Sequence, residues 1–169
     1  MKNIEIEQKY KIKNPAAIRK ALKRLGAKRA GSGLEQNEFY DQRGRLRQKR
    51  LTLRLRKYRG QGKLTFKGPR KAGLGKLSKR VEVESSVAFA QIRRLLELLG
   101  FKKWLSYSKT RETWELAGAE VVIDHFPRFG WFVEIEAAHA RRIRQLSRAL
   151  GLTPDQAVAE SYLAMQLRA

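Results

Sequence analysis

Short runs in which apolar and polar residues alternate dominate this chain. Alternation with period two predicts β-strands, because successive side chains of a strand point to opposite faces. Glycine and turn residues separate the runs, as expected between strands. Nine strands are predicted, at Asn3 to Lys11, Leu34 to Tyr40, Leu51 to Tyr58, Lys63 to Lys67, Ser78 to Glu84, Phe101 to Tyr107, Lys109 to Glu115, Glu120 to Asp124 and Trp131 to Glu136.

Other segments have the apolar spacing of amphipathic helices. Apolar residues recur there every three or four positions, and capping residues or glycines mark the ends. Four helices are predicted: after the cap Asn14 and up to Gly26, after the cap Ser86 and up to Gly100, from Ala140 to Leu150, and from Thr153-Pro154 into the C-terminal SYLAMQLRA.

The polar faces of the predicted strands carry charges of both signs. A single strand of this kind is typical of a sheet with one face in the core and the other in water. Here the pattern recurs on most strands. The charged sets are Glu5, Glu7 and Lys9; Arg54 and Arg56; Lys63 and Lys67; Arg80, Glu82 and Glu84; Lys109 and Arg111; Asp124; and Glu134 and Glu136.

Acidic residues are scarce in this chain, yet many of them lie on the polar faces of the predicted strands. The 169 residues, which suit a single domain spanning 1–169, include 38 Lys and Arg but only 16 Asp and Glu, for a net charge of +22. Seven of those acids lie on the polar strand faces, three times as a Glu-x-Glu pair. If these faces pointed to bulk water, there would be no reason for acids to be paired on them while the rest of the surface is strongly basic. We therefore expect a shared polar interior, formed by closing about eight antiparallel strands into a barrel with helices packed outside, an α+β fold.

The interior charges indicate a site for a metal and a polyphosphate. Arg and Lys match phosphate oxygens, whereas carboxylates among them would repel phosphate unless a divalent cation lay between. The chain has no cysteine and only two histidines, His125 and His139, which disfavours thiolate and histidine metal sites. We expect the cation to be Mg²⁺ or Mn²⁺.

Several motifs resemble the CYTH superfamily, the triphosphate tunnel metalloenzymes that include class IV adenylyl cyclases and thiamine triphosphatases. The resemblance begins with Glu5-Ile6-Glu7-Gln8-Lys9, similar to the family's Glu-x-Glu-x-Lys signature, and continues in order along nearly the whole chain. The further motifs are FYD at 39–41, LRLR at 53–56, KLTFKGP at 63–69, KRVEVE at 79–84, SKTRETWE at 108–115, VVID at 121–124, GWFVEIEA at 130–137 and the terminal SYLAMQL.

This resemblance implies an eight-stranded antiparallel tunnel barrel and a role for each matching residue. It implies metal binding by Glu5, Glu7, Glu134 and Glu136, with Asp124 close to the metal. It implies triphosphate contacts from Lys9, Arg54, Arg56, Lys67, Arg80, Lys109 and Arg111, and catalytic roles for Lys9, Arg111 and Asp124. Glu84 is either a further metal ligand or a partner of the basic residues.

The implied chemistry is metal-assisted attack on a triphosphate. A class IV adenylyl cyclase would form cyclic AMP and pyrophosphate from ATP, and this is our first expectation. A triphosphatase acting on inorganic triphosphate, thiamine triphosphate or a nucleotide is the alternative. A nucleic-acid or polyphosphate binding module is a third hypothesis, disfavoured because interior carboxylates weaken phosphate binding.

The chain has no signal peptide or 18-residue apolar run, so we expect a cytoplasmic monomer or homodimer without membrane contact.

Overall fold

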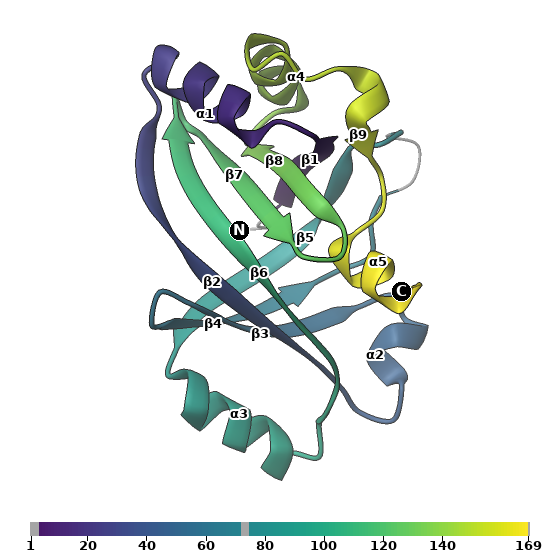
Figure 1. Cartoon of the computed structure of the whole chain (residues 1–169). Coiled ribbons are helices and arrows are strands. Elements are labelled where there is room, and N and C mark those ends of the chain that lie inside the picture. Colours follow the sequence, from purple (N-terminus) through teal and green to yellow (C-terminus); the bar gives the residue numbers. More distant parts are fainter. Residues whose placement is uncertain (1–3, 72–74, 169) are drawn as a thin grey trace. The chain divides into compact units, whose positions relative to one another are not determined.

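The computed structural model describes residues 4–71 and 75–168 (Figure 1). The chain divides into two compact units, each of which is described by itself. Of the described residues, unit 1 contains Ile4, Gly33–Arg70 and Arg80–Lys109. Unit 2 contains Glu5–Ser32, the described part of Lys71–Lys79, and Thr110 onward to residue 168.

The described residues form nine strands that belong to one hydrogen-bonded sheet. The order is β5-β4-β3-β2-β6-β7-β8-β1-β9, and β5 pairs additionally with β1, which closes eight strands into a barrel. The predicted α+β fold with a closed antiparallel eight-stranded barrel is confirmed. The strands are β1 (Ile4–Ile12), β2 (Lys28–Asp41), β3 (Thr52–Tyr58), β4 (Gln61–Lys67), β5 (Ser78–Val87), β6 (Lys102–Leu116), β7 (Ala119–Phe126), β8 (Gly130–Ala137) and β9 (Ala157–Val158).

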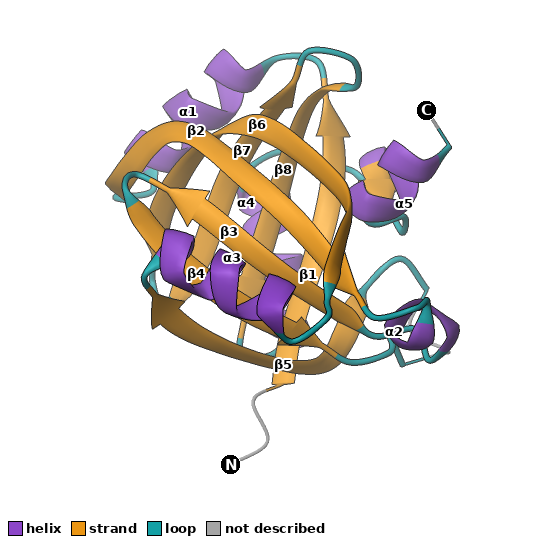
Figure 2. Ribbon diagram, turned by 90° about the horizontal axis from the view of Figure 1, so that it is seen from below, coloured by secondary structure: helices purple, strands orange, loops and turns teal. Residues whose placement is uncertain are grey.

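In unit 1, helix α3 (Phe89–Leu98) lies across strands β3 and β4, as Figure 2 shows. Its buried Leu96 packs with Leu55 of β3 and Tyr40 of β2 in a small apolar core. The start of α3 can approach β4 closely because β4 carries Gly62, where a Cβ atom would lie 2.9 Å from the amide nitrogen of Phe89. This core covers only part of the apolar faces of these strands, since Phe66 of β4 and Val81 and Val83 of β5 remain exposed. Unit 1 also contains the short helix α2 (Arg45–Gln48).

In unit 2, helices α1 (Pro15–Arg24) and α4 (Ala140–Ala149) bury the apolar faces of β1, β7 and β8. Ile18 and Leu22 of α1 and Ile143 and Leu146 of α4 belong to the same core as Ile135 of β8. The Asn14 side chain caps α1 by accepting from the Ala17 amide at 3.1 Å, as predicted. This core fixes which face of each strand is left for the charged side chains.

The strand predictions are confirmed for most of the sheet, with three differences. The expected strands Phe101 to Tyr107 and Lys109 to Glu115 form one continuous strand, β6. Strand β2 begins at Lys28, six residues before the predicted start, and β9 was not predicted. The expected start of the first strand at Asn3 lies outside the described residues.

Two helix predictions are wrong in detail. Ser86 does not cap α3, because it lies in β5 and the N-cap position belongs to Ala88. The single C-terminal helix expected after Thr153 is instead a 3₁₀ turn (Pro154–Gln156), strand β9 and a short helix α5 (Tyr162–Leu167). In the described part of the chain, no helix has the length and apolar character needed to cross a membrane.

Candidate functional site

Strand register places the charged residues of unit 2 on one face of its sheet. Arg111 of β6 lies opposite Asp124 of β7, and Lys9 of β1 lies opposite Glu134 of β8. Residues directly opposite each other in paired strands project from the same face. The face is the one opposite the apolar core, so the predicted inside-out pattern holds for these four strands.

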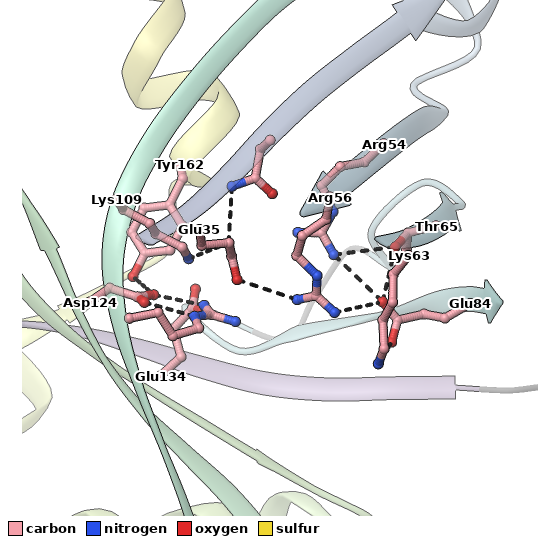
Figure 3. Close-up of polar contacts among 12 residues, drawn as sticks. Glu35, Arg54, Arg56, Lys63, Thr65, Glu84, Lys109, Asp124, Glu134 and Tyr162 are labelled. Atoms are coloured by element: carbon pink, nitrogen blue, oxygen red, sulfur yellow. Dashed lines mark hydrogen bonds and ion pairs between the residues drawn. The ribbon is translucent and has the colours of Figure 1, made fainter. Parts of the chain in front are cut away.

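Asp124 lies at the centre of a buried ionic network, which we call the Asp124 cluster (Figure 3). Arg111 donates two hydrogen bonds to its carboxylate, at 2.8 and 2.7 Å, and a third to Glu134 at 3.0 Å. Tyr162 of α5 donates to the same carboxylate at 3.0 Å. Burial, followed by the charges of Asp124 and Glu134, raises the pKa of Tyr162, so its hydroxyl remains protonated and donates.

Lys9 is the fifth member of the Asp124 cluster. Its ammonium donates to the Glu160 carbonyl at 2.9 Å and lies 3.5 Å from the Glu134 carboxylate. It also lies 3.6 Å from the centroid of the Tyr162 ring, a cation–π contact. The Asp124 cluster therefore pairs two cations with two carboxylates.

The same face of unit 2 carries a row of glutamates. Glu7 of β1 lies opposite Glu136 of β8, and Glu136 in turn lies opposite Glu120 of β7. Glu115 of β6 extends the row by facing Glu120. Like charges directly opposite each other in paired strands are destabilising. Across residues 4–71 and 75–168, no three or more Asp, Glu or His side chains gather closely enough to hold a metal ion.

Unit 1 has a second ionic network, centred on Glu84 of β5 and called the Glu84 cluster. Arg56 approaches the Glu84 carboxylate to 3.2 Å and Lys63 to 3.1 Å, and Thr65 donates to it at 2.9 Å. Arg54 lies 3.7 Å from the same carboxylate. Figure 3 shows these side chains converging on Glu84 from β3 and β4. Burial acts to raise the pKa of Glu84, but Arg56, Arg54 and Lys63 outweigh it and lower the pKa to about 2.

Glu35 of β2 is the second carboxylate of the Glu84 cluster. It is fully buried, accepts a hydrogen bond from Asn37 at 3.0 Å, and lies 3.6 Å from Arg56. The ammonium of Lys109, also buried, is 3.4 Å from it. Burial acts to lower the pKa of Arg54. The charge of Glu35, followed by those of Tyr107, Glu82 and Glu84, outweighs burial and raises the pKa. Four cations thus share two carboxylates.

The structure divides the predicted site residues between the two units. Glu84 forms ion pairs with basic residues, the second of the two roles left open for it. Lys67 lies beside the Glu84 cluster and pairs with Glu82 at 2.6 Å, and Arg80 occupies the same strand as both glutamates. Unit 1 holds Arg54, Arg56, Lys67, Arg80, Glu84 and Lys109, and unit 2 holds Glu5, Glu7, Lys9, Arg111, Asp124, Glu134 and Glu136.

Sequence reasoning gave no role to four polar residues of these clusters. Glu35 and Asn37 follow the alternation of β2, but the stretch was assigned as a strand without weighing its polar face. Thr65 belongs to the polar face of β4 and carries no charge to draw attention. Tyr162 lies 38 residues from Asp124, and nothing local in the sequence links them.

Comparison with known proteins places the chain among relatives of the same length and fold. A protein of Methanocaldococcus jannaschii named "putative adenylate cyclase" is 27% identical over 96% of this chain and 98% of its own. The X-ray structure of a "putative adenylate cyclase" from Vibrio parahaemolyticus superposes with a TM-score of 0.88, at 22% identity, over 100% of both chains. A Hippeastrum structure described as a "putative adenylyl cyclase" that "reveals a dominant triphosphatase activity" covers 97% of this chain and 95% of its own, with a TM-score of 0.70 and 18% identity.

A protein-family model also matches the chain, over a range that includes the Glu-x-Glu-x-Lys motif at residues 5–9. The model of the CYTH domain matches residues 3–151, which include both ionic clusters except Tyr162. The chain belongs to the CYTH domain family.

Proposed function

We propose that this chain is a divalent-metal-dependent enzyme that acts on a triphosphate substrate. The observation that carries the proposal is the excess of positive charge in the Glu84 cluster. Arg54, Arg56, Lys63 and Lys109 each lie within 3.7 Å of the Glu35 or the Glu84 carboxylate. Gathering four cations costs free energy unless anions compensate them, and phosphate oxygens supply the missing negative charge.

The hydrogen bonding of Arg54 supports a phosphate ligand at this cluster. Its side chain is only 12% exposed, and its Nε atom is buried without a hydrogen-bond partner among the residues described. A buried donor of this kind costs about 1 to 3 kcal/mol, which a phosphate oxygen would recover. Arg54 and Arg56 present planar guanidinium groups, which bind phosphate through paired N–H donors.

Carboxylates of unit 2 have the donor chemistry that the family's divalent metal requires. Mg²⁺ is usually held by one or two carboxylates together with substrate phosphates, and Mn²⁺ accepts the same oxygen ligands. The facing pair Glu7 and Glu136 fits this description, and Glu5 and Glu134 lie two residues from them. When bound, the metal neutralises charge that develops on phosphoryl oxygens. We assign Glu7 and Glu136 as the principal ligands and Glu5 and Glu134 as further candidates.

The Asp124 cluster would supply basic groups held in fixed positions. Asp124 is fully buried and engaged by two hydrogen bonds from Arg111, so we assign it to positioning Arg111 instead of to the metal. Arg111 and Lys9 then contact the triphosphate and stabilise negative charge that develops during reaction. Lys67, Arg80 and Lys109 remain proposed triphosphate contacts.

Cyclisation of ATP is the reaction that we propose first. The name of the Methanocaldococcus relative points to this activity. In a cyclase, the ribose 3′-hydroxyl attacks the α-phosphorus and pyrophosphate leaves. Hydrolysis by attack of water on the γ-phosphorus uses the same binding groups and is the second candidate, since the description of the Hippeastrum structure reports triphosphatase activity for that protein.

A product assay tests the proposal. The protein is incubated with Mn²⁺ or Mg²⁺ and, in parallel, ATP, inorganic triphosphate or thiamine triphosphate. We expect cyclic AMP with pyrophosphate from ATP. Orthophosphate from any of the three would establish a triphosphatase instead. Absence of turnover with every substrate and both metals would contradict the proposal, as would undiminished turnover in metal-free buffer.

A further inference from the structure

The C-terminal segment at residues 157–167 contacts two residues to which the proposed function gives a role. The CYTH match ends at residue 151, so this segment lies beyond it. Strand β9 pairs with β1 at a single place, where Val158 lies opposite Lys9 and Ala157 opposite Tyr10. The segment is therefore fixed to the sheet beside Lys9.

Two groups of this segment hold the Lys9 ammonium. The Glu160 carbonyl accepts a hydrogen bond from it at 2.9 Å, and the face of the Tyr162 ring lies 3.6 Å away. With Glu134 at 3.5 Å, these contacts surround an ammonium group whose residue is only 6% exposed. A lysine side chain has four rotatable carbon–carbon bonds, so such contacts restrict it to few conformations.

Tyr162 also reaches the other cation of the Asp124 cluster, through Asp124. Its hydroxyl donates to Oδ2 of Asp124, the same oxygen that accepts from Arg111 at 2.7 Å. One tyrosine thus contacts Lys9 with its ring and positions Arg111 through its hydroxyl.

Tyr162 is itself held firmly. Its ring centroid lies 4.7 Å from that of Phe126 and 5.4 Å from that of Phe132, and the residue is 6% exposed. Ser161 caps α5 by accepting from the Ala164 amide at 3.1 Å. A rigid support of this kind is what a positioning group requires.

We propose that Tyr162, assisted by the Glu160 carbonyl, is a positioning residue that aligns Lys9 and Arg111 for the triphosphate. The inference rests on the proposed function, which assigns phosphate contacts to both cations. It adds that the segment beyond the CYTH match completes the Asp124 cluster. The ring acts on Lys9 and the hydroxyl acts on Arg111, so different substitutions separate the two effects.

Two substitutions and a matched control test the proposal. Tyr162→Phe removes the hydroxyl and keeps the ring, whereas Tyr162→Leu removes both. The control is Tyr40→Phe in unit 1, where a tyrosine that is 1% exposed donates to the Glu38 carboxylate at 2.7 Å. Both phenylalanine variants lose a buried hydrogen bond to a carboxylate, but only one of these bonds belongs to the Asp124 cluster.

Steady-state kinetics should distinguish positioning from a loss of stability. For Tyr162→Phe we expect kcat to fall about tenfold with KM within about twofold, the effect of one charge-assisted hydrogen bond. For Tyr162→Leu we expect a similar fall in kcat and, in addition, a rise in KM of about tenfold, because Lys9 is released. Tyr40→Phe should change neither constant at a temperature where all variants are folded. Kinetics of Tyr162→Phe that match those of Tyr40→Phe would overturn the proposal.

Chemical labelling tests the contact with Lys9 without relying on activity. Acetylation by an N-hydroxysuccinimide ester, followed by mass spectrometry, reports access to the Lys9 amine. Exposed Lys11 on the same strand serves as the internal reference. We expect Tyr162→Leu to accelerate Lys9 acetylation at least about fivefold relative to Lys11, and Tyr40→Leu to leave it unchanged. An unchanged Lys9 rate in Tyr162→Leu would overturn the proposed role of the ring.

The two assays separate failure of this inference from failure of the proposed function. If the unmodified protein turns over no triphosphate but Tyr162→Leu exposes Lys9, the proposed function is wrong and the structural role of Tyr162 is supported. If turnover occurs and neither Tyr162 variant changes it, the proposed function stands and the positioning role is wrong.

Discussion

The two ionic clusters use the same residue types in different proportions. In the Glu84 cluster of unit 1, Arg54, Arg56, Lys63 and Lys109 share Glu35 and Glu84. In the Asp124 cluster of unit 2, two cations meet two carboxylates, and a row of four further glutamates lies on the same face. The Glu84 cluster therefore contains more cations than carboxylates, whereas carboxylates outnumber cations among these residues of unit 2.

From this difference we infer a division of labour, in which one unit chiefly binds phosphate and the other binds the metal. An excess of buried cations favours an anionic ligand, whereas facing carboxylates favour a divalent cation. We assign phosphate binding chiefly to the Glu84 cluster and metal binding to the glutamates of unit 2. The net charge of +22 does not reveal this, because it averages over both units and over basic residues on their outer surfaces.

Loss of the metal should have the largest effect. Chelation with EDTA, or the substitution Glu136→Gln, should reduce kcat by at least about 1000-fold, because charge on the phosphoryl oxygens is no longer neutralised. Turnover is measured in EDTA and again after excess Mn²⁺ is added, which should restore the activity of the unmodified protein. Glu97→Gln serves as the control, since Glu97 is exposed on α3 and pairs only loosely with Arg94, at 3.7 Å. Full activity of Glu136→Gln would remove the metal role from unit 2.

Removing a cation from the Glu84 cluster should have the next largest effect. Arg56→Ala should raise KM for the triphosphate about 30-fold, equivalent to about 2 kcal/mol of lost phosphate binding. Lys57→Ala is the matched control, because Lys57 is the next residue of β3 and is exposed. Initial rates over a range of substrate concentrations provide the measurement. Equal KM values for the two variants would show that the Glu84 cluster does not bind substrate.

The pKa of Glu84 predicts a smaller, pH-dependent effect on stability. Its folded-state pKa of about 2 lies below the ordinary value of 4.5, so the ionised form stabilises the fold at pH above 4.5. The contribution is lost as pH falls from 4.5 to about 2. Allowing for solvent screening at this partly exposed residue, Glu84→Gln should lower the free energy of unfolding by about 1 to 2 kcal/mol at pH 7.

Urea denaturation at several pH values measures this contribution. The difference between Glu84→Gln and the unmodified protein should shrink as pH falls through the window from 4.5 to about 2. Glu97→Gln controls for the loss of a carboxylate elsewhere. A constant difference across the window would show that the ion pairs of Glu84 do not stabilise unit 1.

The smallest effect on catalysis is expected for an ion pair on the opposite face of the sheet in unit 2. Glu112 of β6 accepts hydrogen bonds from Arg19 of α1 at 2.6 and 3.0 Å. Glu112→Gln should lower the free energy of unfolding by about 1 kcal/mol and leave kcat and KM unchanged. Thermal denaturation and kinetics test this together. A large loss of activity would mean that catalytic groups are not confined to the polar face.

Alternation of polar and apolar residues was enough to predict which face of most strands carries charge. The Glu-x-Glu pairs at Glu5 and Glu134, and Arg54 with Arg56, could be assigned in this way because period two is a local property. Strand register is not local. That Glu7 faces Glu136, or that Glu84 meets Arg56 and Lys63, depends on pairing between distant segments.

Weak local signals explain the remaining errors. Residues 28–32, Lys-Arg-Ala-Gly-Ser, lack β-branched and aromatic residues, yet they belong to β2 because the sheet extends that far. Apolar spacing after Thr153 suggested one helix, but pairing of β9 with β1 interrupts it. This interruption also places Tyr162 beside Lys9, a contact that no spacing rule predicts.

Binding of Mn²⁺ in the absence of substrate tests the division of labour most directly. Electron paramagnetic resonance of Mn²⁺ titrated into Arg56→Ala and Glu136→Gln compares one cluster with the other in a single measurement. We predict that Arg56→Ala binds Mn²⁺ as the unmodified protein does, whereas Glu136→Gln loses at least about tenfold in affinity. Unchanged Mn²⁺ affinity in Glu136→Gln, or a comparable loss in Arg56→Ala, would contradict the assignment of the metal to unit 2.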